Sequence, residues 1–160
     1  MRRARRWLLP LTLLLAMLLT IVPLPQPIAP WRPHWLALVM IYWQIETRAL
    51  RGLGQPFALG LVLDLLTGAL LGQHALGLVI INFLVGRFRN RIRFFPIWQQ
   101  TLIIGAVLFN DRIVNLWIVG LVERGWPGWN WWLPPLTAML LWPWLYLAMD
   151  RMRLAWRTGR

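Results

Sequence analysis

The chain has 160 residues, of which 59% are hydrophobic, and its mean hydropathy is +0.55. A soluble domain of this size cannot bury so large an apolar share, so the composition predicts one membrane domain over residues 1–160. All seventeen basic residues are Arg, and they lie in short clusters between long apolar runs, which argues against nucleic-acid binding. The chain has no Cys and two His, which excludes disulfides and argues against a metal site, so we expect no cofactor.

The first apolar run follows the basic stretch MRRARR and covers residues 7–22. A basic segment before an apolar one is typical of a signal peptide. The best small residue for cleavage, however, is Ala29, and Pro30 follows it directly. We therefore expect an uncleaved first membrane span.

Five further apolar runs lie at residues 35–47, 56–71, 74–86, 97–122 and 131–149. The third and fourth are shorter than the roughly 20 residues that cross a hydrocarbon core, so hydropathy alone would allow them to fuse. The Arg clusters decide the number, because positively charged loops stay on the cytoplasmic side. These clusters lie at residues 2–6, 48 and 51, 87–93, and 151–160. Keeping all of them on one side predicts an all-α bundle of six transmembrane helices with both termini cytoplasmic.

One acidic residue, Asp64, interrupts the third run. It belongs to the segment GLVLDLLTGALLGQHAL, which covers residues 60–76. On a continuous helix Gly60, Asp64, Gly68 and Gly72 would share one face, and stripes of small residues let membrane helices approach closely. A central Asp costs about 2.5–3.5 kcal/mol, which the neighbouring apolar residues offset by roughly 3–5 kcal/mol. We therefore expect Asp64 on a packed face between helices.

The partner of Asp64 is left open by the sequence. Arg112 is the one Arg within an apolar run, so a buried Asp64–Arg112 pair would neutralise both charges. Asp111, Asn82 or a water molecule are alternative partners, and Asn115 lies one turn beyond Arg112. The carboxylate could serve as a polar link between helices, as part of a proton or ion relay, or as a contact to another protein.

A second group of residues is expected at the membrane interface or in contact with partners. Aromatic side chains favour the interface, and a proline inside a helix bends it. The group consists of Pro33, Trp35, Tyr42, Trp43, Trp98, Gln99, Gln100 and Pro143. We expect Glu46 and His34 at the interface as well. No nucleophile–base pair or phosphate-binding loop is recognisable, so we expect no enzyme.

Four segments in order resemble the MreD family of bacterial rod shape-determining proteins. They are RPHWLALVMIYW at 32–43, GLVLDLLTGALLGQHAL at 60–76, WQQ at 98–100 and LWPWLYLAMDRMR at 141–153. The form of the first segment is similar to the proteobacterial type. The resemblance covers essentially the whole chain.

The resemblance implies a non-catalytic scaffold or regulator of the rod complex, or elongasome, in the bacterial inner membrane. It implies MreC as the main partner, with RodA, its penicillin-binding transpeptidase and, indirectly, MreB. It also implies a fold similar to the substrate-binding subunits of energy-coupling-factor transporters. Membrane lipids are further expected partners, because juxtamembrane Arg residues favour an anionic leaflet.

A rival prediction is a membrane protein that binds a small molecule or a lipid-linked precursor. Such a protein needs a polar pocket at its outer face. The outer loops offer Arg32, His34, Glu123 and Arg124 for that purpose, and an outward cavity closed over these residues would favour this alternative.

Overall fold

The computed structural model describes residues 2–47, 50, 52–123 and 127–158. Within these residues it is all-helical, with six α-helices, two short 3-10 helices and no strand, which confirms the all-α prediction. The α-helices are α1 (Arg2–Ile21), α2 (Trp35–Thr47), α3 (Gly54–Thr67), α4 (Gln73–Ile92), α5 (Ile97–Glu123) and α6 (Leu133–Thr158). The 3-10 helices are η1 (Ala29–Trp31) and η2 (Trp129–Trp132).

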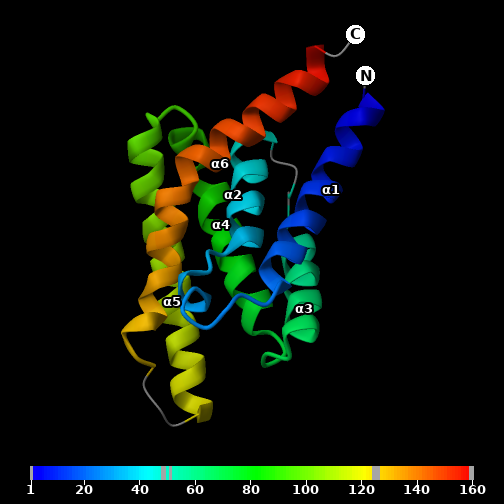
Figure 1. Cartoon of the computed structure of the whole chain (residues 1–160). Coiled ribbons are helices and arrows are strands. Elements are labelled where there is room, and N and C mark those ends of the chain that lie inside the picture. The colour runs from blue at the N-terminus through cyan, green and yellow to red at the C-terminus, as the bar shows by residue number, and fades with distance from the viewer. Residues whose placement is uncertain (1, 48–49, 51, 124–126, 159–160) are drawn as a thin grey trace.

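The helices run up and down along one axis (Figure 1). The start of α1 and the end of α6 lie at the same end as the α4–α5 connection, and the α3–α4 connection lies at the other. Arg side chains gather at the first of these ends, which we call the basic end: Arg87, Arg91 and Arg93 from α4 and its continuation, and Arg151 and Arg153 from α6. The opposite end carries η1, η2 and the α3–α4 turn.

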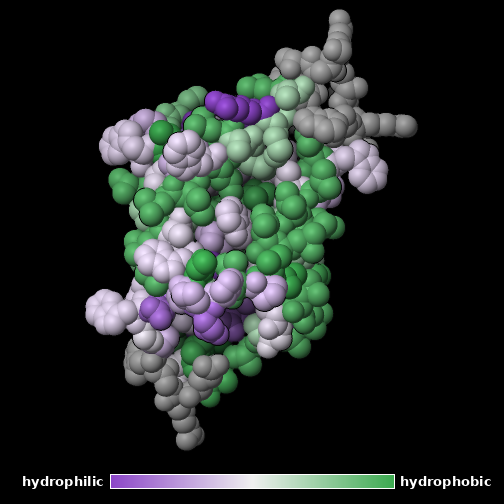
Figure 2. Space-filling model, viewed as in Figure 1, coloured by the Kyte–Doolittle hydropathy of each residue, from purple (hydrophilic) through white to green (hydrophobic). Residues whose placement is uncertain are grey.

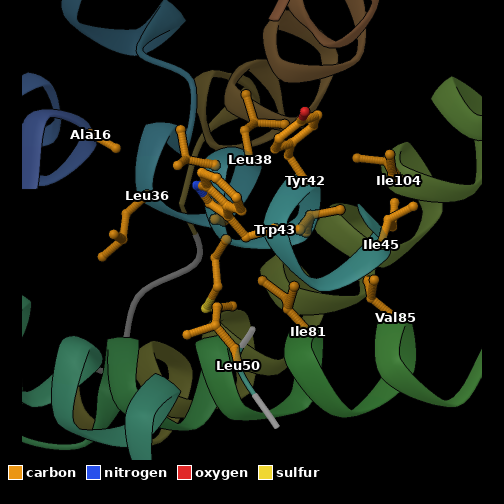
Figure 3. Packing of buried hydrophobic residues seen from close by; sticks show 14 of the residues in the cluster. Ala16, Leu36, Leu38, Tyr42, Trp43, Ile45, Leu50, Ile81, Val85 and Ile104 are labelled. Carbon is orange, nitrogen blue, oxygen red and sulfur yellow. The ribbon is translucent and has the colours of Figure 1, made fainter. Parts of the chain in front are cut away.

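Helix α2 forms the centre of the bundle. It packs against α1, α4 and α6, and every residue from Leu36 to Glu46 is buried. A helix that is apolar on all sides belongs in a core, so its sequence suits this position. Figure 3 shows its side chains meeting Ala16 of α1, Ile81 and Val85 of α4, and Ile104 of α5.

Many large hydrophobic side chains are exposed on the outside of the bundle, and apolar side chains cover much of the face seen in Figure 2. Leu121 is 80% exposed, and Trp117 one turn earlier is 70% exposed. Continuous apolar surface of this extent is not stable in water and suits contact with lipid or another protein. By length and composition, one helix in the described part of the chain, Ile97–Val122, is long and apolar enough to cross a membrane.

The helix bounds differ from the hydropathic runs in an informative way. The run at 56–71 extends past the end of α3 at Thr67, whereas the run at 74–86 stops well before α4 ends at Ile92. Hydropathy marks where the chain is apolar, but Arg is a good helix former, so α4 continues through the Arg-rich stretch at 87–91. The left-handed glycines Gly68 and Gly72 end one helix and begin the next.

Candidate functional site

Asp64 organises the turn between α3 and α4. Its side chain is buried, and its carboxylate accepts hydrogen bonds from the amides of Gly72 at 2.8 Å and His74 at 2.9 Å. His74 Nδ1 lies 2.8 Å from the same carboxylate, and the Ala75 amide lies at 3.5 Å. The first amides of a helix lack partners within it and carry partial positive charge. Asp64 therefore caps the N-terminus of the helix that follows it.

The expected glycine face is wrong for two of its three glycines. Gly68 has φ 68° and Gly72 has φ 96°, so both lie in the turn and not on a helix face. A left-handed conformation favours glycine at these positions. Gly60 does lie at a close helix approach, because a Cβ there would be 2.2 Å from the Cα of Ala75 in α4.

The expected partners of Asp64 lie elsewhere. Asn82 donates to the carbonyls of Leu50 at 3.1 Å and Gly52 at 3.2 Å, and so ties the chain before α3 to α4. The Asp64–Arg112 pair is not formed, because the α4 amides and His74 occupy the carboxylate. Helix ends buried away from water need such partners, which explains why a local cap prevails over the distant Arg.

A cavity of about 540 Å³ opens beside this turn, at the end opposite the basic end. It is lined by residues of all six α-helices, by the α1–α2 connection and by the region around η2. Its polar lining residues are Thr20, Arg32, His34, Thr67, His74, Asp111, Arg112, Asn115 and Asn130. Figure 2 shows hydrophilic side chains gathered in the lower half of the visible face and bordered by apolar ones.

Arg112 is held in the cavity by two contacts. Its Nη2 lies 2.7 Å from Nε2 of His34, and its guanidinium lies 4.8 Å from the centre of the Trp131 ring, within the range of a cation–π interaction. A guanidinium only donates hydrogen bonds, so His34 Nε2 accepts and the imidazole proton is on Nδ1. Burial lowers the pKa of His34 well below its usual value, and the charge of Arg112 lowers it further. His34 is therefore neutral at pH 7.

Arg32 closes the end of α1 beside the same cavity. Its Nη1 donates to the carbonyl of Thr20 at 2.7 Å, and its Nη2 donates to the carbonyl of Val22. The last carbonyls of a helix carry partial negative charge, so a cation there is favourable. Arg32 is thus fixed to the backbone, with its guanidinium at the cavity wall.

Asp111 and Asn115 form the α5 side of the cavity. Asp111 is buried against α4, where a Cβ at Gly77 would be 2.2 Å from its Oδ1. Asn115 donates from Nδ2 to the carbonyl of Asp111 at 2.9 Å. Gly77 therefore allows the carboxylate of Asp111 to lie directly on the backbone of the neighbouring helix.

A second polar cluster lies at the basic end and joins α2, α4 and α6. Glu46 binds Arg153 Nη1 at 2.5 Å and accepts from the hydroxyl of Tyr146 at 2.8 Å. Arg153 also pairs with Asp150 at 2.5 Å. Arg89 donates to the carbonyls of Gln44 at 3.1 Å and Glu46 at 3.2 Å, at the end of α2. Glu46 is therefore a buried link between helices and not the interfacial residue that we expected.

The expected interfacial residues divide into two groups. Tyr42 and Trp43 are core residues, 0% and 3% exposed, and Trp43 donates to Thr12 Oγ1 of α1 at 2.8 Å. Pro33 and Gln100 are also buried, and Gln100 donates to the carbonyl of Phe95 at 3.1 Å.

The other residues of this group reach the surface to different degrees. Trp98 is 60% exposed, whereas Trp35, Gln99 and Pro143 are half-buried. Pro143 lies inside α6, which changes direction along its length in Figure 1.

The sequence placed Arg32 and His34 together at an outer pocket, but it did not predict that His74 and Arg112 join them. The one available signal was that both His of the chain fall at the starts of apolar runs, which the six-helix arrangement places at one end. Of the two other residues expected at an outer pocket, Arg124 lies outside the described residues and Glu123 is the last residue of α5. Arg48 and Arg51 also lie outside the described residues.

The cavity lining supplies hydrogen-bond donors and acceptors, the two guanidinium groups of Arg32 and Arg112, and one carboxylate, Asp111. The chain contains neither Ser nor Cys, the usual nucleophiles of covalent catalysis. Within the described residues, no three His, Asp or Glu side chains lie close enough together to hold a metal ion. The arrangement suits binding of an anion.

Comparison with known proteins identifies relatives along nearly the whole chain. The family model described as rod shape-determining protein MreD matches residues 1–152. The rod shape-determining protein MreD of Haemophilus influenzae (strain ATCC 51907 / DSM 11121 / KW20 / Rd) is 30% identical over 139 residues, covering 87% of this chain and 86% of the relative. No solved structure matches the chain.

Proposed function

The chain belongs to the MreD family of rod shape-determining proteins, and from this premise we propose that it is a non-catalytic scaffold of the bacterial inner membrane. In this role it supports lateral peptidoglycan synthesis by holding MreC and RodA-type partners together. The observation that carries the proposal is the apolar outer surface of the bundle, which has its charged groups at the ends and in the interior. Such a body offers its sides to lipid and to the transmembrane helices of partners.

The proposed topology is six membrane spans with the basic end in the cytoplasm. Helices α4 and α6 have 20 and 26 residues, about 30 and 39 Å long, although their polar ends lower their mean hydropathy. The short helix α2 is surrounded by α1, α4 and α6, so protein and not lipid contacts most of its surface. The Arg residues at one end agree with the positive-inside rule.

The proposed partner surface is the exposed apolar stripe of α5. Ile113, Trp117 and Leu121 follow at intervals of four and are 44%, 70% and 80% exposed. Residues at this spacing share one face of a helix, so a transmembrane helix of MreC could pack along them. Soluble partners such as MreB would be reached indirectly, because the described connections are too short to form a domain.

Two experiments test the proposal. Because the chain has no Cys, single Cys variants can be labelled directly. A membrane-impermeant maleimide should label Trp129→Cys in intact spheroplasts and Arg91→Cys only after permeabilisation. The reverse pattern would reject the topology.

The second experiment is co-purification from native membranes in mild detergent. Recovery of MreC and RodA in near-equal amounts supports the scaffold, and Trp117→Ala should lower that recovery more than Trp98→Ala, which changes an exposed Trp at the other end of α5. Recovery of a transporter ATPase without MreC or RodA would reject it. The cavity of about 540 Å³ favours ligand binding as a second function.

A further inference from the structure

The cavity carries an excess of positive charge in its wall. Arg32 and Arg112 are each held in place by contacts to fixed groups, whereas Asp111 is the one carboxylate among the described lining residues. His34 is neutral because its Nε2 accepts from Arg112. His74 directs Nδ1 to Asp64 outside the lining. Two cations against one anion leave one positive charge for a ligand to neutralise.

Both guanidinium groups retain donor capacity. Nε of Arg32 and Nε of Arg112 are buried and have no acceptor among the described residues. A buried charged donor without an acceptor is unfavourable, and a bound anion would supply the missing acceptor. The two groups come from different elements, the α1–α2 connection and α5, and meet at one cavity.

The shape of the donor set distinguishes between anions. A planar carboxylate matches one guanidinium, whereas a tetrahedral phosphate presents oxygens in several directions and can accept from two. The cavity volume lies within the range of small-molecule sites, and Leu36, Leu63 and Leu78 line its apolar part. The cavity therefore has room for an anion larger than inorganic phosphate and offers it apolar as well as polar contacts.

We infer that this cavity binds a monoanionic phosphate ester, with the phosphate between Arg32 and Arg112 and the remainder against the apolar wall. Such a group could come from a water-soluble metabolite or from the head group of an anionic lipid. The inference does not depend on the scaffold function, because it rests on the cavity alone.

The test measures binding to the full-length protein in detergent by native mass spectrometry. The probes are glycerophosphoglycerol, which is the soluble head group, dihexanoyl-phosphatidylglycerol and dihexanoyl-phosphatidylcholine. We expect one or both monoanionic probes to bind at least tenfold more tightly than the phosphatidylcholine. Binding of the soluble head group identifies a metabolite-type site, and binding of the anionic lipid alone identifies a lipid site.

Variants separate the cavity from non-specific attraction to Arg. Arg112→Gln should weaken binding at least tenfold, and Arg151→Gln, an equal change of charge at the basic end, should leave it unchanged. Ala29→Phe places a large side chain on a loop that lines the cavity and should also block binding, which keeps the test valid if Arg112→Gln fails to fold. Equal binding to the Arg112 and Arg151 variants, equal affinity for phosphatidylcholine, or no binding of either anionic probe would overturn the inference.

Discussion

Replacing Asp64 by Leu should strongly destabilise the protein, because the carboxylate is the cap of α4. It accepts three hydrogen bonds of 2.8–2.9 Å, from two amides and from the His74 side chain. Hydrogen bonds to a buried charged group contribute about 1.5–3 kcal/mol each, so the loss of all three should cost at least about 4.5 kcal/mol of unfolding free energy. Asn keeps one acceptor oxygen but points an amide toward a donor, so Asp64→Asn should cost about half as much, roughly 2–3 kcal/mol.

The assay is unfolding of the purified protein in mixed micelles by SDS titration, followed by the fluorescence of its thirteen Trp residues. Membrane abundance is measured in parallel, since a loss of this size can prevent accumulation. Asp150→Asn is the matched control, because its pair with Arg153 is more exposed than Asp64 and Arg153 keeps Glu46 as a partner, so the change should cost about 0–1 kcal/mol. A stability of Asp64→Asn within about 0.5 kcal/mol of the wild type would refute the capping role, since no buried charged hydrogen bond is that weak.

Three further predictions concern packing, the basic end and pH. Gly60→Ala should destabilise the protein by about 1–3 kcal/mol, because the added Cβ would clash with the α4 backbone. Gly120→Ala should leave the stability unchanged, because no atom beyond its own stretch of helix backbone lies within 4 Å of the added Cβ. The melting temperatures of the two variants are compared. Glu46→Gln should cost about 2–3 kcal/mol by leaving Arg153 without its buried partner, as measured by SDS unfolding at low and high salt. His34 should make stability fall as the pH drops below about 6.5, because the unfolded chain binds the proton there and the folded chain does not.

Each of these predictions has an outcome that would contradict it. Equal melting temperatures of Gly60→Ala and Gly120→Ala would mean that α3 and α4 are further apart than the structure shows. Glu46→Gln should also loosen α6, so unchanged proteolysis of the C-terminal segment would argue against the link. For His34, the control is His34→Gln, in which stability should depend less on pH below about 6.5. If the stability of this variant falls as steeply as that of the wild type, another group is responsible for the pH dependence.

Charged side chains hold the helix ends together at both ends of the bundle. At one end Glu46, Arg89 and Arg153 fix the ends of α2, α4 and α6 to one another. At the other end Asp64 and Arg32 cap α4 and α1 around a cavity. Arg89, Asp64 and Arg32 each match a charge to the helix end that it meets, which satisfies backbone groups that lipid cannot solvate. The interior polar residues therefore stabilise the body, and the sides remain available to partners.

The sequence by itself determined the helical class, the apolar character and the family. These properties depend on sums along the chain: hydropathy over each run, the spacing of Arg clusters, and four motifs in order. The Arg clusters also predicted that the third and fourth runs form separate helices. The structure confirms this, because α3 and α4 are separate helices. The prediction from the glycine spacing was wrong at Gly68 and Gly72. An interval of four residues fits one face of a helix, but it fits this turn equally well.

Only the tertiary structure decided which charges meet. His34 and Arg112 are 78 residues apart, and Glu46 and Arg153 are 107 apart, yet each pair is in direct contact. A residue's type predicts that it needs a partner when buried, but several partners of suitable charge exist along the chain. The choice depends on which helix ends are brought within hydrogen-bond distance, and that follows from packing around α2. The cavity has the same origin, since its wall is formed where all six α-helices and connections between them converge.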